Sequence, residues 1–285
     1  MRKPTVSSPI RLAAILLCCA VPGMCLLAQE ETSPSQSFDY SLYAKVLEAY
    51  VNDKGMVNYA GLKQDQEDFR AFLQSMANLE PTVYASWPEA DQIAFYSNAY
   101  NALTIRAILN HYPIRASGLS ALRYPKNSIR QIDGVWKKLK FRVMGRSVTL
   151  DHIEHGILRK DFAEPRIHMA IVCASIGCPI LRNEPYTGER LDEQFEQQSI
   201  EFLKRPSALR VDLAKGAIHL SPIFKWFGED FEKAYNTDQF PGQNRTDQAV
   251  LNFVAQHASP TVGNFLEAAE RKVAYSDYDW SLNEQ

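Results

Sequence analysis

Hydrophobic residues along the chain recur at two spacings, which predicts a mixture of helices and hairpins. Apolar residues three or four positions apart predict helices, and alternating apolar residues predict short strands. The expected helices cover residues 38–51, 60–79, 88–111, 150–160, 189–204, 223–235, 247–257 and a last segment from residue 260. The expected hairpins pair 135–143 with 147–150 and 209–213 with 217–220. Because helices and hairpins mix without regular alternation, the pattern favours an α+β fold in a single compact domain.

The helix expected over 88–111 is the longest and most apolar of the chain. We expect it to lie in the core, packed on a small mixed or antiparallel sheet. Asn98 and Asn101 stand one helical turn apart inside it. A buried amide without a partner costs about 1–3 kcal/mol, so both side chains need hydrogen-bond partners. Two interpretations stay open: a polar bridge that clamps the helix to a loop, and a pair of amides that line a pocket.

The segment 167–174 is a short apolar run, and we expect it to be the strand around which the fold is organised. His168 stands near its start and Cys173 near its end, with Cys178 in the loop that follows. Side chains alternate between the two faces of a strand, so His168 and Cys173 are expected on opposite faces. Within the strand His168 would then not activate Cys173, whereas the loop could return Cys178 toward it.

Residues 1–28 have the pattern of a secretory signal, with Arg2, Lys3 and Arg11 ahead of an apolar stretch. That stretch is too short and too interrupted to favour a membrane span. Its cysteines lack the neighbouring small residues of a lipoprotein signal, so anchoring ranks below simple export. Residues 29–37 are polar and predict a flexible tether, which leaves 38–285 as the single domain. We therefore expect an exported protein, either periplasmic or secreted.

The charge balance argues against a nucleic-acid partner. The whole chain has a formal net charge of −2, and removal of the three leader cations leaves 28 Lys and Arg against 33 Asp and Glu, a net charge of −5. Nucleic-acid binding requires a basic excess, which is missing here. The expected partner is therefore a small molecule or a peptide.

Cys173 and Cys178 are the only cysteines outside the predicted leader. An even number of cysteines in an exported protein is typical of a disulfide. The chain at Ile176 and Gly177 must fold back to bring the two Cα atoms within bonding reach. The alternative is that Cys178 is a thiolate nucleophile, which requires a nearby base and a lowered pKa. The sequence leaves both interpretations open.

The short helix over 150–160 carries His152, Glu154 and His155. Histidines three positions apart share a helix face. A zinc-protease helix has its histidines four apart with a glutamate between them, so we expect no metal and no other cofactor here. His155 and His168 are the candidate general bases for any thiol chemistry.

Three blocks of the chain resemble the family known as domain of unknown function 547. They are Phe95–Leu103, Leu150–Arg159 and Pro165–Pro179, and the closing Tyr278–Asn283 is similar to the end of that family. The resemblance implies no activity, because none is assigned to the family. It does imply that the signature blocks include Asn98, Asn101, Glu154, His155, Arg166, His168, Cys173, Ser175 and Cys178. The order of a long helix and a His-led strand is also similar to transglutaminase-like thiol enzymes, but their cysteine is absent from residues 94–98.

These observations predict one small pocket where three elements converge. The long helix would contribute Asn98 and Asn101, the short helix Glu154 and His155, and the segment 166–178 the side chains of Arg166, His168 and Cys178. In an enzyme, a thiol hydrolase or acyl transferase, Cys178 would be the nucleophile, a histidine the base and an amide the oxyanion donor. In the competing hypothesis the protein is a binding module, and the same residues form a disulfide and a buried polar bridge.

Overall fold

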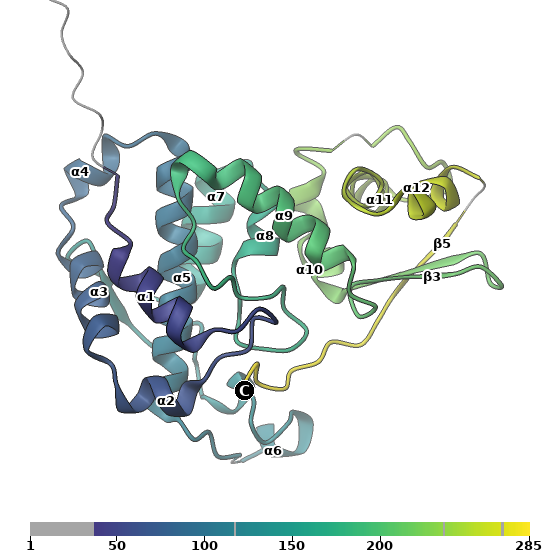
Figure 1. Cartoon of the computed structure of the whole chain (residues 1–285). Helices are drawn as coiled ribbons and strands as arrows, with labels where there is room; N and C mark the ends of the chain where they lie inside the picture. The colour runs from purple at the N-terminus through teal and green to yellow at the C-terminus, as the bar shows by residue number, and fades with distance from the viewer. Residues whose placement is uncertain (1–36, 117, 236, 269–270) are drawn as a thin grey trace, which may run out of the picture. The chain divides into compact units, whose positions relative to one another are not determined.

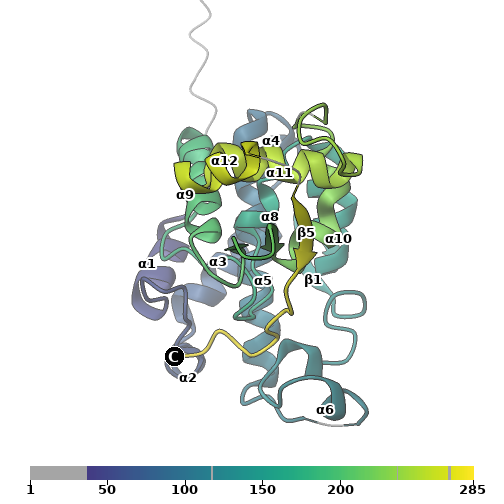
Figure 2. The same cartoon turned by 90° about the vertical axis from the view of Figure 1, so that its right-hand side faces the viewer.

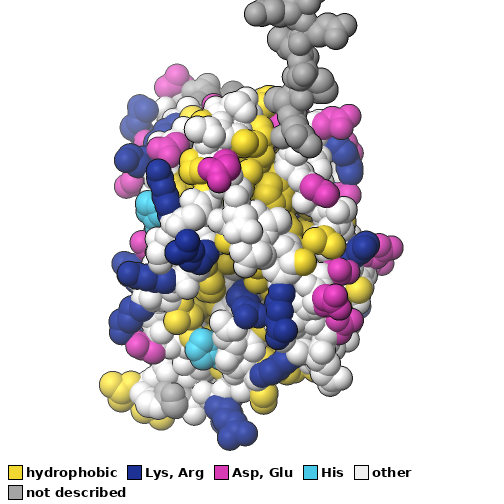
Figure 3. All heavy atoms as spheres, turned by 90° about the vertical axis from the view of Figure 1, so that its left-hand side faces the viewer, with side chains coloured by type: hydrophobic (Ala, Val, Ile, Leu, Met, Phe, Trp, Pro, Cys, Tyr) yellow, Lys and Arg dark blue, Asp and Glu magenta, His cyan; other side chains and the backbone are white. Residues whose placement is uncertain are grey.

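The computed structural model describes residues 37–116, 118–235, 237–268 and 271–285 (Figure 1). The predicted signal and all but the last residue of the predicted tether lie outside these ranges. Within them, no helix is both long and apolar enough to cross a membrane. On the face shown in Figure 3, acidic and basic side chains are both present, with apolar side chains between them.

Helices make up most of the described regular structure. The α-helices are α1 (Ser41–Tyr50), α2 (Tyr59–Gln64), α3 (Glu67–Asn78), α4 (Pro81–Ala85), α5 (Glu89–His111), α6 (Ser120–Arg123), α7 (Arg159–Asp161), α8 (Ile167–Ala170), α9 (Leu191–Leu203), α10 (Pro222–Phe231), α11 (Arg245–His257) and α12 (Pro260–Glu267). Shorter helical stretches are η1 (Ile129–Gln131), the π-helical η2 (His152–Leu158) and η3 (Gly188–Arg190). The long helix α5 packs against α2, η2, η3 and α9.

Strands form two small sheets. The antiparallel pair β1 (Phe141–Val143) and β2 (Arg146–Val148) is the first predicted hairpin, shorter than expected. The hairpin of β3 (Leu209–Asp212) and β4 (Ala217–Leu220) gains a parallel third strand, β5 (Lys272–Tyr275). The second sheet is therefore mixed, in the order β3-β4-β5. The predicted α+β class, with one long core helix and two hairpins, is confirmed.

Two of the predicted elements are wrong in detail. The helix expected over 60–79 is divided into α2 and α3, because the polar run 63–68 has no apolar side chain to bury. The strand expected over 167–174 is the helix α8 followed by irregular chain. All side chains from 167 to 172 are buried, so the run has no polar face from which its period could be recognised.

The segment 167–174 lies between the two apolar clusters of the core. Ile167, Ala170 and Val172 belong to the cluster around α5, whereas Met169 belongs to the cluster around α10 and α11. Successive side chains of one short segment thus connect both halves of the core. The segment thus contributes to both apolar clusters, although it is not a strand.

Candidate functional site

A cavity of about 280 Å³ opens beside the Cys173–Cys178 segment. Its walls come from η1, η2, α5, α10, the segment 168–178 and the C-terminal tail. The lining residues are Tyr100, Arg130, Trp136, Lys137, Asp151, Glu154, His155, His168, Ile171, Cys173, Cys178, Ile223, Trp226, Phe227, Tyr278 and Trp280. The cavity therefore combines two thiols, two histidines and an aromatic wall.

The two thiols are in direct contact at the cavity wall. Both cysteines are free, and their Sγ atoms lie 2.8 Å apart. The Cys178 sulfur accepts three hydrogen bonds. The Cys173 backbone N–H and the Tyr278 hydroxyl each donate to it over 3.0 Å, and the Ser175 hydroxyl donates to it over 3.4 Å. The turn in which the Cys178 amide donates to the Ser175 carbonyl brings the thiols together, as the predicted reversal at Ile176 and Gly177 requires. The disulfide predicted between these two cysteines stays a prediction.

The C-terminal tail, which runs in yellow from β5 to the C-terminus in Figure 2, is hydrogen-bonded to the cysteine loop. Ile176 and Gly177 donate their amides to the carbonyls of Ser281 and Asp279. Gly177 packs so closely under the Tyr278 ring that an added Cβ would lie 2.9 Å from it. Backbone hydrogen bonds to the C-terminal tail therefore fix the cysteine loop, in which Ala174 has a strained backbone φ of 56°.

The surroundings of the two thiols make them chemically unequal. Burial by itself raises the pKa of Cys178, but the hydrogen bonds from Cys173, Ser175 and Tyr278 outweigh it and lower that pKa to about 6. The pKa of Cys173 is raised well above its usual value, first by its hydrogen bond to Cys178, then by burial and the adjacent negative charge. Near neutral pH the pair therefore holds one proton, on Cys173, and one thiolate, on Cys178.

His168 is fixed by Asp230, a residue of α10. Its Nε2 lies 2.8 Å from Asp230 Oδ2, and its ring stacks on Phe227 with the centroids 4.0 Å apart. Burial lowers the pKa of His168 despite the carboxylate. Burial also opposes ionisation of Asp230, but hydrogen bonds from His168 and Arg159 hold its pKa well below the usual range. A neutral His168 thus donates Nε2–H to a charged carboxylate and leaves Nδ1 as an acceptor.

Glu154 and His155 reach the cavity from η2. Glu154 is buried and accepts a hydrogen bond from the Tyr100 hydroxyl over 3.0 Å. Burial raises the pKa of Glu154, partly offset by the positive charges of His155 and Arg159. His155 is the more exposed of the two cavity histidines, and its Nδ1 lies 2.7 Å from the Arg159 guanidinium group.

Three residues expected to bind a ligand lie elsewhere. The Asn98 side-chain amide accepts a hydrogen bond from the backbone N–H of Tyr186 over 2.9 Å and donates one to the Tyr186 carbonyl over 2.7 Å. The Asn101 amide accepts from Val172 over 2.8 Å and donates to Ala170 over 3.0 Å. These are the polar bridges of the first interpretation. Arg166 pairs with Glu164 and Asp192, also away from the described cavity lining.

The structure adds residues that the sequence reasoning had not assigned to the site. Phe227 and Asp230, which contacts His168, come from a helix predicted only as a packing element. Arg130 comes from the short helix η1, and Trp136 and Trp280 come from irregular segments. Tyr278 was recognised in the closing block without a role. The concentration of aromatic residues in that tail was the one signal that pointed to it.

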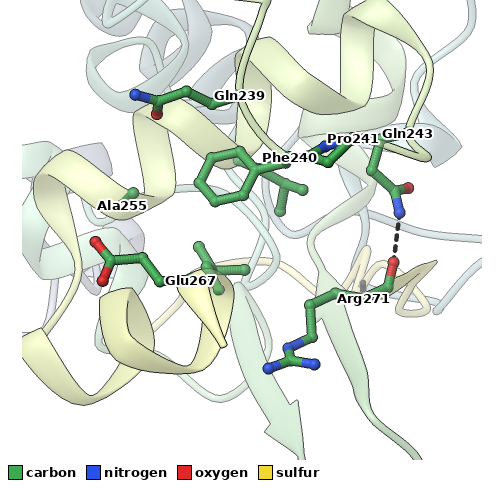
Figure 4. Close-up of a pocket in the computed structure, with 9 residues that line it drawn as sticks. Gln239, Phe240, Pro241, Gln243, Ala255, Glu267 and Arg271 are labelled. Atoms are coloured by element: carbon green, nitrogen blue, oxygen red, sulfur yellow. Dashed lines mark hydrogen bonds between the residues drawn. The ribbon is translucent and has the colours of Figure 1, made fainter. Parts of the chain in front are cut away.

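A second cavity of the described structure lacks the thiols and the histidines of the first. The cavity in Figure 4, of about 440 Å³, lies against α11 and α12, where Gln243 donates to the Arg271 carbonyl. Neither a cysteine nor a histidine occurs among the described residues that line it. Groups of three or more His, Cys, Asp and Glu side chains suited to a metal ion are likewise missing from the described ranges.

Residues 84–203 match the family model described as "Protein of unknown function, DUF547". The match confirms the resemblance predicted from the sequence. The matched residues include α5, η2 and the whole cysteine loop. The closing Tyr278–Asn283 lies outside the matched residues. Neither a curated protein nor a solved structure gives a significant match.

Proposed function

We propose that Cys173 and Cys178 of this DUF547-like protein form a dithiol–disulfide redox pair that acts on a small molecule or peptide bound in the adjacent cavity. The observation that carries the proposal is the 2.8 Å contact between two free sulfur atoms at the cavity wall. A single nucleophilic cysteine needs no second thiol in contact with it. Thiol–disulfide exchange within one chain does, because the second sulfur must resolve the first mixed disulfide.

In the reducing direction, the Cys178 thiolate attacks one sulfur of a substrate disulfide. A bond forms between Cys178 and that sulfur, and the other substrate sulfur leaves as a thiolate. Cys173 then attacks Cys178 as its own proton leaves, which releases the second substrate thiolate and forms the Cys173–Cys178 disulfide. The cysteine pair loses two electrons and the substrate disulfide gains them, while protons convert the released thiolates to thiols. A dithiol regenerates the pair by the reverse steps.

The unequal pKa values of the pair support this order of events. Cys178, with a pKa of about 6, is a thiolate at neutral pH and is ready to attack. The charge of that thiolate contributes to the raised pKa of Cys173, which stays protonated meanwhile. Once Cys178 is bound in a mixed disulfide its negative charge is gone. Cys173 then loses its proton more easily, when it is needed for the second step.

A second function, acyl transfer or hydrolysis, is favoured by the His168–Asp230 pair, which lies beside the same cavity. In that mechanism Cys178 attacks a carbonyl carbon, and neutral His168 accepts or returns a proton through Nδ1. This proposal does not require Cys173. Hydrogen bonds of His168 or His155 to a sulfur atom do not occur within the described residues, so the redox pair is the better-supported proposal.

Mass spectrometry after incubation with a disulfide, together with an activated-ester assay, distinguishes the two functions. Both use the full-length protein with the leader changes Cys18→Ser, Cys19→Ser and Cys25→Ser, which serves as wild type here. For a redox pair, Cys173→Ser accumulates a mixed disulfide on Cys178, wild type forms an internal disulfide that resists alkylation until reduced, and Cys178→Ser forms neither product. For an acyl transferase, Cys173→Ser keeps its turnover of an activated ester and Cys178→Ser loses it. If wild type alkylates fully without reduction after the incubation, the redox proposal is wrong.

A further inference from the structure

We infer that the substrate is a small disulfide that carries a carboxylate, and that Arg130 binds this carboxylate in the same cavity as the thiols. The inference rests on the proposed redox function and adds the substrate class to it. The inference is based on the position of Arg130, a cation without an acidic partner among the described residues, in the same cavity as the Cys173–Cys178 pair. An apolar wall extends from the cation to the thiols.

Arg130 is held in place by aromatic rings. The centre of its guanidinium group lies 4.4 Å from the ring centroid of Tyr124, 5.0 Å from that of Trp280 and 5.4 Å from that of Trp136. It also donates to the Tyr124 hydroxyl. Stacking on rings fixes a guanidinium group while leaving part of its edge free to donate to a ligand. The head group of Arg130 is thus positioned before a ligand arrives.

The acids that line the cavity do not neutralise this cation. Asp151 lies 3.9 Å from both Lys137 and His155, and the Glu154 carboxyl accepts from Tyr100. For Arg130, the described part of the chain contains no ion-pair partner within 4.0 Å. An arginine in this position attracts an anion, and its planar edge matches the two oxygens of a carboxylate. One fixed cation also balances the single charge of a carboxylate.

The path from Arg130 to the thiols is lined by the C-terminal tail. Trp280 faces Arg130, and its ring centroid lies 4.6 Å from that of Tyr278. Tyr278 in turn donates its hydroxyl to the Cys178 sulfur. Trp226 packs on both tail rings, with centroids 4.9 and 5.9 Å away. This wall favours a ligand whose sulfur and carboxylate are separated by an apolar or aromatic part.

Two chromogenic disulfides test the inference on the reduced full-length protein with the leader changes Cys18→Ser, Cys19→Ser and Cys25→Ser, which leave Cys173 and Cys178 as the only thiols of the chain. This protein serves as wild type in the comparison. Dithiobis(nitrobenzoate) carries carboxylates, whereas dithiodipyridine is uncharged at neutral pH, and stopped-flow absorbance gives the rate constant for each. We expect Arg130→Gln to lower the ratio of the carboxylate rate to the neutral rate by about tenfold, the loss typical of one charge-assisted contact. Arg130→Lys should retain part of that ratio. Arg142→Gln, which removes an exposed cation of β1 outside the cavity lining, should leave the ratio unchanged.

The outcomes separate this inference from the function beneath it. If wild type reacts with both reagents through Cys178 and the ratio is the same in Arg130→Gln, the inference is wrong and the redox pair stands. If Arg142→Gln lowers the ratio as much as Arg130→Gln does, a diffuse charge effect replaces the site and the inference fails. If wild type reacts with neither reagent, the redox function fails and the substrate class fails with it.

Discussion

Tyr278 donates its hydroxyl to the Cys178 sulfur over 3.0 Å from a position 100 residues further along the chain. The same hydroxyl lies 3.0 Å from the Ser175 hydroxyl and 3.5 Å from the Cys173 sulfur. One phenol from the C-terminal tail therefore contacts both thiols and the Ser175 hydroxyl beside them. The reactivity of a loop at residues 173–178 thus depends on the last residues of the protein.

Tyr278→Phe should make Cys178 a weaker acid. The ring still covers Gly177, but a hydrogen bond that stabilises the thiolate is lost, so the pKa rises from about 6 toward its ordinary value. At pH 6 we expect alkylation of Cys178 to slow about fivefold, with little change at pH 9. Rates of iodoacetamide labelling against pH measure this directly. An unchanged pH profile would show that the phenol has no part in stabilising the thiolate.

The buried His168 should make the protein lose stability as the pH falls. Its folded-state pKa is lowered, so the unfolded chain binds a proton that the folded chain resists. The loss therefore begins as the pH falls through 6.5, the ordinary pKa of histidine, and ends below the lowered pKa of the folded state. Asp230, whose pKa is also lowered, adds a further loss as the pH falls below 3.8.

The contribution of His168 is isolated by comparing variants. Glu154 has a raised pKa and acts in the opposite sense, gaining stability as the pH falls, but its contribution is common to all variants. We expect His168→Gln to be less stable than wild type at pH 8 and to lose less on going to pH 5. Urea unfolding at both pH values measures the difference. The exposed His111 provides the control, and equal pH slopes for His111→Gln and His168→Gln would contradict the prediction.

The sequence predicted the components of the site better than their geometry. His155, His168, Cys173 and Cys178 were recognised as unusual, and all four line one cavity. Their arrangement was not predictable, because a short apolar run that is buried on all sides has no helical or strand periodicity. The segment that forms α8 therefore fits the pattern of a strand as well as that of a helix. In a strand, side chains alternate between the two faces, which would have placed His168 and Cys173 on opposite faces. Asp230 and Arg130 were missed because contacts over dozens of residues leave no local pattern.

Asn101→Ala should destabilise the fold more than an equivalent change on the exposed side of the same helix. Its amide bonds two backbone groups, at Ala170 and Val172, and both are buried. Truncation leaves them without partners, so we expect a loss of about 2–4 kcal/mol in the free energy of unfolding. Asn110→Ala, at an exposed position of α5, should change it by less than about 0.5 kcal/mol. Urea unfolding of both variants gives the comparison, and equal losses would mean that the polar bridge contributes little.

Gly177→Ala should impair the thiol pair and the fold together. The new Cβ would lie 2.9 Å from the Tyr278 ring and 3.0 Å from the Asp279 carbonyl oxygen, closer than such atoms normally approach. The ring must move away from the loop, which costs about 1–3 kcal/mol and weakens its hydrogen bond to Cys178. We therefore expect lower stability in urea and slower labelling of Cys178 near pH 6.

Gly263→Ala is the matched control, because an added Cβ at that position in α12 meets no atom within 4 Å. Alanine is the better helix former, so this variant should equal or exceed wild type in stability and label Cys178 at the wild-type rate. If Gly177→Ala also labels at the wild-type rate while losing stability, the close packing under Tyr278 supports the fold alone. The tail would then not control the acidity of Cys178, and Tyr278→Phe should likewise leave the labelling unchanged.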